Sequence, residues 1–177
     1  MDIILIVGPS GVGKSSAIEL VKRQFEHMIF HSLDDLAALF GAGERLIDTA
    51  CVQKLRRHFR NDDRFLEYGL KAIGALAAKH PDKRIVIDVG AGFQVAKAAS
   101  DLHRTYLVIA ISSIPQEAYR RICARPGEKR TMQQYVADEF NASRRRVYES
   151  AHETIDTSQK TKEVVADELA EILRRMQ

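Results

Sequence analysis

Apolar residues form short runs along this chain, and the stretches between the runs have helical periodicity. Runs of strand length occupy residues 3–7, 28–30, 85–89 and 105–111, and a weaker one lies near 154–155. Between them, apolar residues recur every three or four positions, which is typical of amphipathic helices. Strands that alternate with helices predict βαβ crossovers. We therefore expect an α/β fold in three layers, with a parallel sheet covered by helices on both faces.

The segment from about 41 to 80 is too long for a single crossover between two strands. Glycines and an Asn-Asp-Asp cluster punctuate it, and its apolar residues form two helical faces. We interpret it as a helical insertion over the functional site. A third face lies near the C-terminus. The expected core positions of the three faces are Leu46, Ile47, Ala50, Cys51 and Leu55; Leu66, Leu70, Ile73 and Leu76; and Val164, Val165, Leu169, Ile172 and Leu173.

Length and composition indicate one globular domain, residues 1–177. At 177 residues a full core is possible without disulfides, and the two cysteines, Cys51 and Cys123, are too few for a disulfide framework. No run is long enough to span a bilayer, and the first apolar run is too short for a signal peptide. A net charge of +3 is too small to indicate nucleic-acid binding. We expect a cytoplasmic monomer or weak dimer that binds neither a membrane nor nucleic acid.

The turn after the first apolar run carries the strongest motif in the sequence. Gly8, Gly13, Lys14 and Ser15 match the pattern G-x-x-x-x-G-K-S/T between a strand and a helix, which is typical of a phosphate-binding P-loop. Backbone amides bared by the glycines and by the helix N-terminus form an anion site. Lys14 would reach the β- and γ-phosphates of ATP, and the Ser15 hydroxyl would hold Mg²⁺. The predicted nucleotide contacts are Gly8, Ser10, Gly11, Val12, Gly13, Lys14, Ser15 and Ser16.

Acidic and glycine residues follow the second and third strands, at the sheet edge where ligands of parallel α/β folds bind. Asp88 would help to hold Mg²⁺, or it caps the next turn. Asp34 would orient or deprotonate an acceptor hydroxyl, or it caps the following helix. The residues Gly90, Ala91 and Gly92 would bind the acceptor through their amides, or they form a tight turn.

Arginines are concentrated between residues 120 and 146. Guanidinium groups suit the charge that develops during phosphoryl transfer, although most arginines on a helix are solvated surface groups. The Arg125–Pro126–Gly127 sequence breaks the helical pattern. We interpret residues 125–131 as a short lid that closes over the reaction.

In their order along the chain, these motifs resemble the shikimate kinase family, within the wider nucleoside monophosphate kinase-like fold. The resemblance includes the late "RRRVYESA" stretch. It implies a five-stranded parallel sheet and transfer of the ATP γ-phosphoryl group to a hydroxyl of a small molecule. It also implies that Asp34 and residues 90–92 contact the acceptor and that Arg125 closes over the phosphates. Arg145 would pair with an acceptor carboxylate, and Arg120 or Arg121 would lie against adenine.

Three positions depart from the family pattern. A second acceptor-binding aspartate would stand at Ser32, a central glycine at Ala91, and a carboxylate-binding arginine at Leu66. We therefore expect an ATP- and Mg²⁺-dependent kinase whose small hydroxylated acceptor is not shikimate. A nucleoside or nucleoside monophosphate kinase, a nucleotide-binding regulator without acceptor chemistry, and a kinase of nucleic-acid ends stay open as alternatives.

Overall fold

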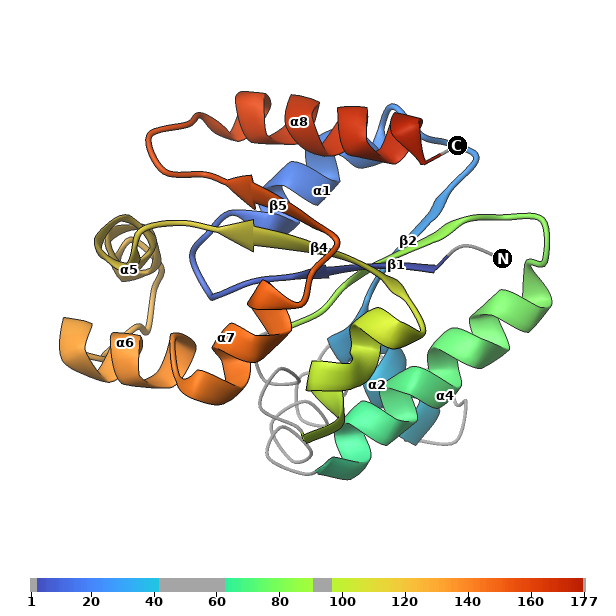
Figure 1. Ribbon diagram of the computed structural model, residues 1–177, viewed down its shortest axis with the longest axis horizontal. Coiled ribbons are helices and arrows are strands. Elements are labelled where there is room, and N and C mark those ends of the chain that lie inside the picture. The colour runs from blue at the N-terminus through green and yellow to red at the C-terminus, as the bar shows by residue number, and fades with distance from the viewer. Residues whose placement is uncertain (1–2, 42–62, 91–96, 177) are drawn as a thin grey trace.

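The computed structural model describes residues 3–41, 63–90 and 97–176, and its strands form one five-stranded sheet (Figure 1). The strand order is β2-β3-β1-β4-β5, and every neighbouring pair is parallel. This confirms the predicted parallel α/β fold. The strands are β1 (Ile3–Val7), β2 (Ile29–Ser32), β3 (Ile85–Asp88), β4 (Leu107–Ser112) and β5 (Glu153–Asp156).

Helices cover both faces of the sheet, as Figure 1 shows. On one face, α1 packs beside α8. On the other face lie α2, α4, the 3₁₀ helix η2 and α7, while α5 and α6 lie beyond the carboxyl ends of β4 and β5. The bounds are α1 (Lys14–Lys22), α2 (Leu33–Gly41), α4 (Asp63–Lys79), η2 (Lys97–Arg104), α5 (Pro115–Cys123), α6 (Met132–Glu139), α7 (Ala142–Glu149) and α8 (Lys162–Arg175).

The central strand β1 is apolar at every position because both of its faces are buried. Ile4 and Ile6 belong to the core on the α1 and α8 side. Leu5 and Val7 belong to the core on the α2 and α4 side. Successive side chains of a strand point to opposite faces, so an uninterrupted apolar run is what a doubly covered strand requires.

Most of the expected core positions that the structure describes are buried. On α4, Leu66 and Ile73 are buried, and Leu70 and Leu76 pack against the same core. On α8, Val165, Leu169, Ile172 and Leu173 are buried, whereas Val164 is exposed, so the prediction for Val164 was wrong. It lies in the first turn, on the solvent side. The expected face at 46–55 lies outside the described residues.

The position of β1 between β3 and β4 decides where a ligand can bind. After β1 the chain continues to β2, beyond β3, and after β3 it continues to β4, beyond β1. Connections that diverge in this way leave a crevice at the carboxyl ends of the two strands. Helix α4, the described part of the 41–80 segment, packs beside α2 against the sheet. No helix among the described residues could cross a membrane.

Candidate active site

The P-loop joins β1 to α1 in a conformation that glycine makes possible. Gly11 has φ +87° and Gly13 has φ +96°, in the left-handed region that disfavours other residues. A Cβ atom on Gly11 would strike the carbonyl of Ala118 on α5. Gly13 occupies the N-cap of α1 without a side-chain cap. The first amides of α1 have no partner within the helix and are available to an anion.

Lys14 is buried inside this loop, with 8% of its surface exposed. Its Nζ donates to the carbonyl oxygens of Gly8 at 2.8 Å and Pro9 at 3.0 Å. Burial lowers the pKa of Lys14, and the charges of Asp88 and Glu139 oppose that shift only in part. The ammonium is therefore held in a polar, poorly solvated position where an arriving phosphate would gain a strong interaction.

Ser15 and Asp88 lie together at the edge of the sheet. The Ser15 hydroxyl donates to Asp88 Oδ2 at 2.7 Å, and Asp88 is the last residue of β3, the strand beside β1. The other carboxylate oxygen, Oδ1, is buried and has no hydrogen-bond partner among the described residues. A hydroxyl and a carboxylate with a spare oxygen are the hard oxygen donors that Mg²⁺ prefers. The pair therefore fits the metal role predicted for it.

A cavity of about 610 Å³ opens beside these residues. It brings together the P-loop, the beginning of α2, the end of β3 and the turn after α5. The described residues that line it are Ser10, Gly11, Gly13, Lys14, Ser15, Ser16, Ile18, Glu19, Lys22, Phe30, His31, Ser32, Asp34, Asp35, Asp88, Gly90 and Arg125. Segments predicted to share a site, although up to 115 residues apart in the chain, thus face one volume.

Asp34 lies in the first turn of α2, which begins at Leu33. Asp34 and Asp35 are therefore inside the helix rather than at its N-cap, and both suit the positive end of the helix dipole. The Asp34 carboxylate faces Gly90 so closely that a Cβ on Gly90 would strike it. Nearby, burial lowers the pKa of His31, partly offset by Asp35. Ala91 and Gly92 lie outside the described residues.

The predicted arginines take different places. Arg125 lines the cavity from the exposed turn after α5. Arg121 instead ties α5 to the end of β5, since its Nη1 and Nη2 donate to Thr157 Oγ1 at 2.9 Å and Thr157 O at 3.0 Å. Neither Arg120, which is exposed, nor Arg121 lines the cavity.

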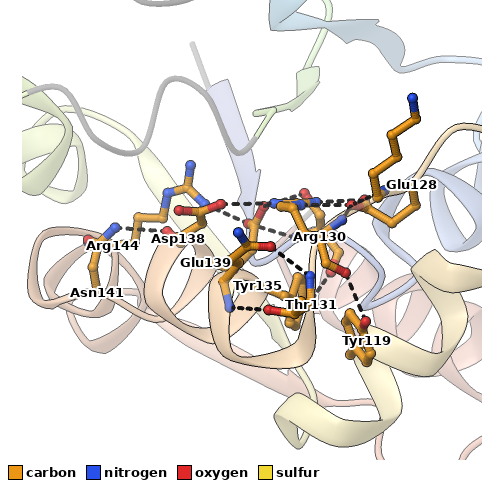
Figure 2. A network of polar contacts seen from close by, with 12 residues as sticks. Tyr119, Glu128, Arg130, Thr131, Tyr135, Asp138, Glu139, Asn141 and Arg144 are labelled. Carbon is orange, nitrogen blue, oxygen red and sulfur yellow. Dashed lines mark hydrogen bonds and ion pairs between the residues drawn. The ribbon is translucent and has the colours of Figure 1, made fainter.

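Arg145 does not reach the cavity either: its side chain is exposed on α7. Its neighbour Arg144 is the buried arginine of this helix, and its Nη1 lies 2.6 Å from Glu139 Oε2 (Figure 2). The three consecutive arginines of α7 point in different directions because adjacent helical residues are about 100° apart. The sequence shows three consecutive arginines, but it does not show in which direction each side chain points.

Sequence reasoning missed Glu139 and Tyr135 on α6, which contact the P-loop through Ser10. A usable signal was present. Thr131 and Gln134 form a capping box at the start of α6, with hydrogen bonds in both directions. The T-x-x-Q spacing predicts a helix from Met132, and that helix places Tyr135 and Glu139 on one face at positions i and i+4.

Comparison with known proteins bears on the family and the fold of the chain. A family model described as shikimate kinase matches residues 10–174. The shikimate kinase structure from Bacteroides thetaiotaomicron is similar with a TM-score of 0.68, at 17% identity over 98% of each chain. That from Aquifex aeolicus gives 0.65, at 19% identity over 97% of this chain and 96% of the other.

The shikimate kinase from Acinetobacter baumannii, solved in complex with shikimate, gives a TM-score of 0.62 at 16% identity, over 100% of this chain and 95% of the other. No curated protein matches the sequence significantly. At these identities the solved structures support the fold, and the family model carries the assignment of family.

Proposed function

The chain belongs to the shikimate kinase family, and from that premise we propose that it phosphorylates a small hydroxylated molecule other than shikimate. Membership makes the protein an ATP-dependent phosphotransferase that acts on a hydroxyl group. The proposal concerns its acceptor and the residues that carry the reaction.

Leu66 is the observation that carries the proposal about the acceptor. The family pattern expects an arginine at this position to pair with the acceptor carboxylate, but Leu66 is 4% exposed and belongs to the apolar core around α2 and α4. Removing one charge-assisted contact costs about 1.5–3 kcal/mol, or roughly tenfold to a hundredfold in affinity. Ser32 lines the cavity where the family has a second aspartate. An acceptor that lacks the carboxylate bound by the family's arginine fits this site better.

The arginines also favour a hydroxyl compound over a nucleotide as acceptor. Of the arginines between residues 120 and 146, only Arg125 lines the cavity. A nucleoside monophosphate would bring its own phosphate and would need cations on the acceptor side. Among the described residues that line the cavity, Asp34 and Asp35 suit hydroxyl groups, because carboxylates accept hydrogen bonds from them.

The proposed reaction is a direct displacement at the γ-phosphorus of ATP. The acceptor oxygen forms a bond to phosphorus, the bond between the γ-phosphorus and the β–γ bridging oxygen breaks, and ADP leaves. Asp34 orients the acceptor hydroxyl and accepts its proton. Lys14 and the amides of the P-loop stabilise negative charge on the phosphates, and Arg125 adds a cation from the 125–131 lid.

Ser15 and Asp88 would hold Mg²⁺. When bound, this ion neutralises phosphate charge and favours the in-line geometry. In the described structure the two residues already lie side by side, as their 2.7 Å hydrogen bond shows.

A ligand-stabilisation screen tests the proposal. The protein is heated with Mg²⁺ and a non-hydrolysable ATP analogue in the presence of shikimate, quinate, sugars, other hydroxy acids, nucleosides or nucleoside monophosphates. A binder raises apparent stability by RT ln(1 + [L]/Kd), so weak acceptors register. ADP formation with each hit then measures turnover. Efficient turnover of shikimate would overturn the proposed acceptor class, whereas turnover of a nucleotide would favour the nucleotide-kinase alternative.

A further inference from the structure

Helix α6 holds Ser10 of the P-loop by every polar atom that this residue has. The Ser10 amide donates to Glu139 Oε2 at 3.1 Å, and its hydroxyl donates to Glu139 Oε1 at 2.9 Å. The Tyr135 hydroxyl donates to the Ser10 carbonyl at 2.6 Å. These contacts link residues 125 and 129 positions apart in the chain. Figure 2 shows Tyr135 and Glu139 within this network of polar contacts.

Glu139 is an unusual group to find in such a place, because its side chain is only 2% exposed. Burying a carboxylate is costly unless it is paired and hydrogen-bonded. Arg144 Nη1 lies 2.6 Å from Oε2, and Arg130 Nη1 lies 3.1 Å from Oε1. Burial raises the pKa of Glu139, but Arg144 and the hydrogen bonds from Ser10 and Arg130 outweigh it and leave the pKa below its ordinary value. The group is ionised at neutral pH.

Arg130 belongs to the 125–131 lid and connects it to Glu139. Glu128 binds the Arg130 guanidinium at Nε (3.0 Å) and Nη2 (2.9 Å), and the Tyr119 hydroxyl donates to the Arg130 carbonyl at 2.8 Å. The guanidinium also lies 5.5 Å above the ring of Tyr135. The chain that carries Arg125 over the cavity is thus attached to the same helix that holds Ser10.

We propose that Glu139 is a positioning residue for nucleotide binding. It holds Ser10 so that the amides following it stay directed at the phosphates, and through Arg130 it sets the lid relative to the P-loop. The side chain does not line the cavity, so it acts through Ser10 and not on the nucleotide. The inference rests on the use of ATP stated under the proposed function, and it is independent of the acceptor.

The test compares Glu139→Gln with Asp138→Asn. Glutamine keeps one acceptor oxygen but puts an amide NH₂ where the second oxygen faces donors. It also removes the negative charge that faces Arg144 and Arg130, although Arg130 keeps its ion pair with Glu128. Asp138 is the adjacent residue, is exposed, and lies 3.6 Å from Arg130 Nη1. The affinity for a non-hydrolysable ATP analogue with Mg²⁺ is measured by calorimetry, and thermal unfolding is followed separately.

We expect Glu139→Gln to weaken nucleotide binding by roughly tenfold to a hundredfold, since hydrogen bonds to a charged group are lost. Asp138→Asn should stay within about twofold, because exposed pairs contribute little. A double-mutant cycle with Ser10→Ala separates positioning from general stabilisation. If Glu139 acts through Ser10, the combined variant binds no more than about twofold more weakly than Glu139→Gln alone.

Wild-type affinity in folded Glu139→Gln, even with a lower melting temperature, would overturn the proposal, and so would fully additive effects in the cycle. If Glu139→Gln does not fold, Tyr135→Phe takes its place, because it removes only the hydrogen bond to the Ser10 carbonyl. That variant should bind the analogue about three- to tenfold more weakly, and unchanged affinity would contradict the proposal. A wild-type protein that binds no ATP analogue would instead refute the proposed function.

Discussion

Two serines of the P-loop each donate a hydroxyl hydrogen bond to a carboxylate, and the two pairs differ in what surrounds them. Ser15 donates to Asp88, which lines the cavity and keeps one buried oxygen without a partner among the described residues. Ser10 donates to Glu139, whose two oxygens are both engaged by arginines and by Ser10, outside the cavity. The first carboxylate has capacity for a ligand, and the second is saturated by the protein.

This difference separates two requirements of phosphate binding. A site must present donors and metal ligands to the substrate, and its backbone must be held in place before the substrate arrives. Preorganised donors need no rearrangement during the reaction, which is why they contribute strongly to catalysis. The Asp88 side of the loop meets the first requirement, and we assign the second to the Glu139 side.

Lys14→Ala should have the largest effect, because it removes the buried cation of the P-loop. The charges of both carboxylates, Asp88 and Glu139, raise the pKa of this lysine and so favour its charged form. Loss of one preorganised group that stabilises developing charge costs roughly 10²–10³ in kcat, and we expect a loss of at least that size. ADP release with the acceptor identified by the screen measures it. Lys79→Ala, at an exposed position in the last turn of α4, is the matched control. Retained activity in Lys14→Ala would remove the lysine from the mechanism.

Gly90→Ala tests the acceptor-binding part of the cavity without changing the P-loop. The added Cβ would strike the Asp34 carboxylate and displace it. We expect kcat to fall by up to about a hundredfold, because a small misplacement of a reacting group is costly. Nucleotide affinity should stay as in the wild type.

Gly74→Ala serves as the control for Gly90→Ala, since a Cβ there has no neighbour within 4 Å among the described residues. Equal activity in the two variants would show that the Asp34 position does not matter.

Comparing Ser15→Ala with Ser10→Ala separates the two serines by their response to Mg²⁺. Each substitution should weaken nucleotide binding about tenfold in the presence of Mg²⁺, the effect of one hydrogen bond or ligand. When EDTA removes the metal, the defect of Ser15→Ala should disappear, whereas that of Ser10→Ala should persist. Calorimetric titration of ATP with and without Mg²⁺ measures both. The same metal response in both variants would break the distinction drawn here.

The smallest predicted effect concerns acid stability on the Glu139 side. Hydrogen bonds from the side chain and backbone of Arg130 lower the pKa of Glu128 from 4.5 to about 2. A depressed carboxyl pKa stabilises the folded state above 4.5, and this contribution is lost as pH falls through the folded pKa near 2. Glu128→Gln should therefore flatten the decline in melting temperature between those pH values.

The exposed Glu26→Gln is the control for the acid-stability series. An unchanged profile in Glu128→Gln would show that its ion pair with Arg130 adds no pH-dependent stability.

The outline of the fold was predictable because it follows from local patterns. Uninterrupted apolar runs separated by helical segments require a parallel sheet covered on both faces, and the structure confirms it. The P-loop was predictable for a similar reason, since its glycines, Lys14 and Ser15 all lie between positions 8 and 15 of the chain. Asp34, Asp88 and Gly90 could be placed at one edge because the carboxyl ends of parallel strands meet there. Their roles in the reaction stay predictions.

What the sequence alone determined about this protein is therefore the family, the sheet and the phosphate-binding turn, all of which depend on neighbouring residues or on strand direction. Only the tertiary structure decided that Arg144 is buried while Arg145 is exposed, and that Ser10 is held by Glu139. Those outcomes depend on the rotation of α6 and α7 and on contacts between residues 129 positions apart. Local patterns carry no information on such distances, because the packing of helices sets them.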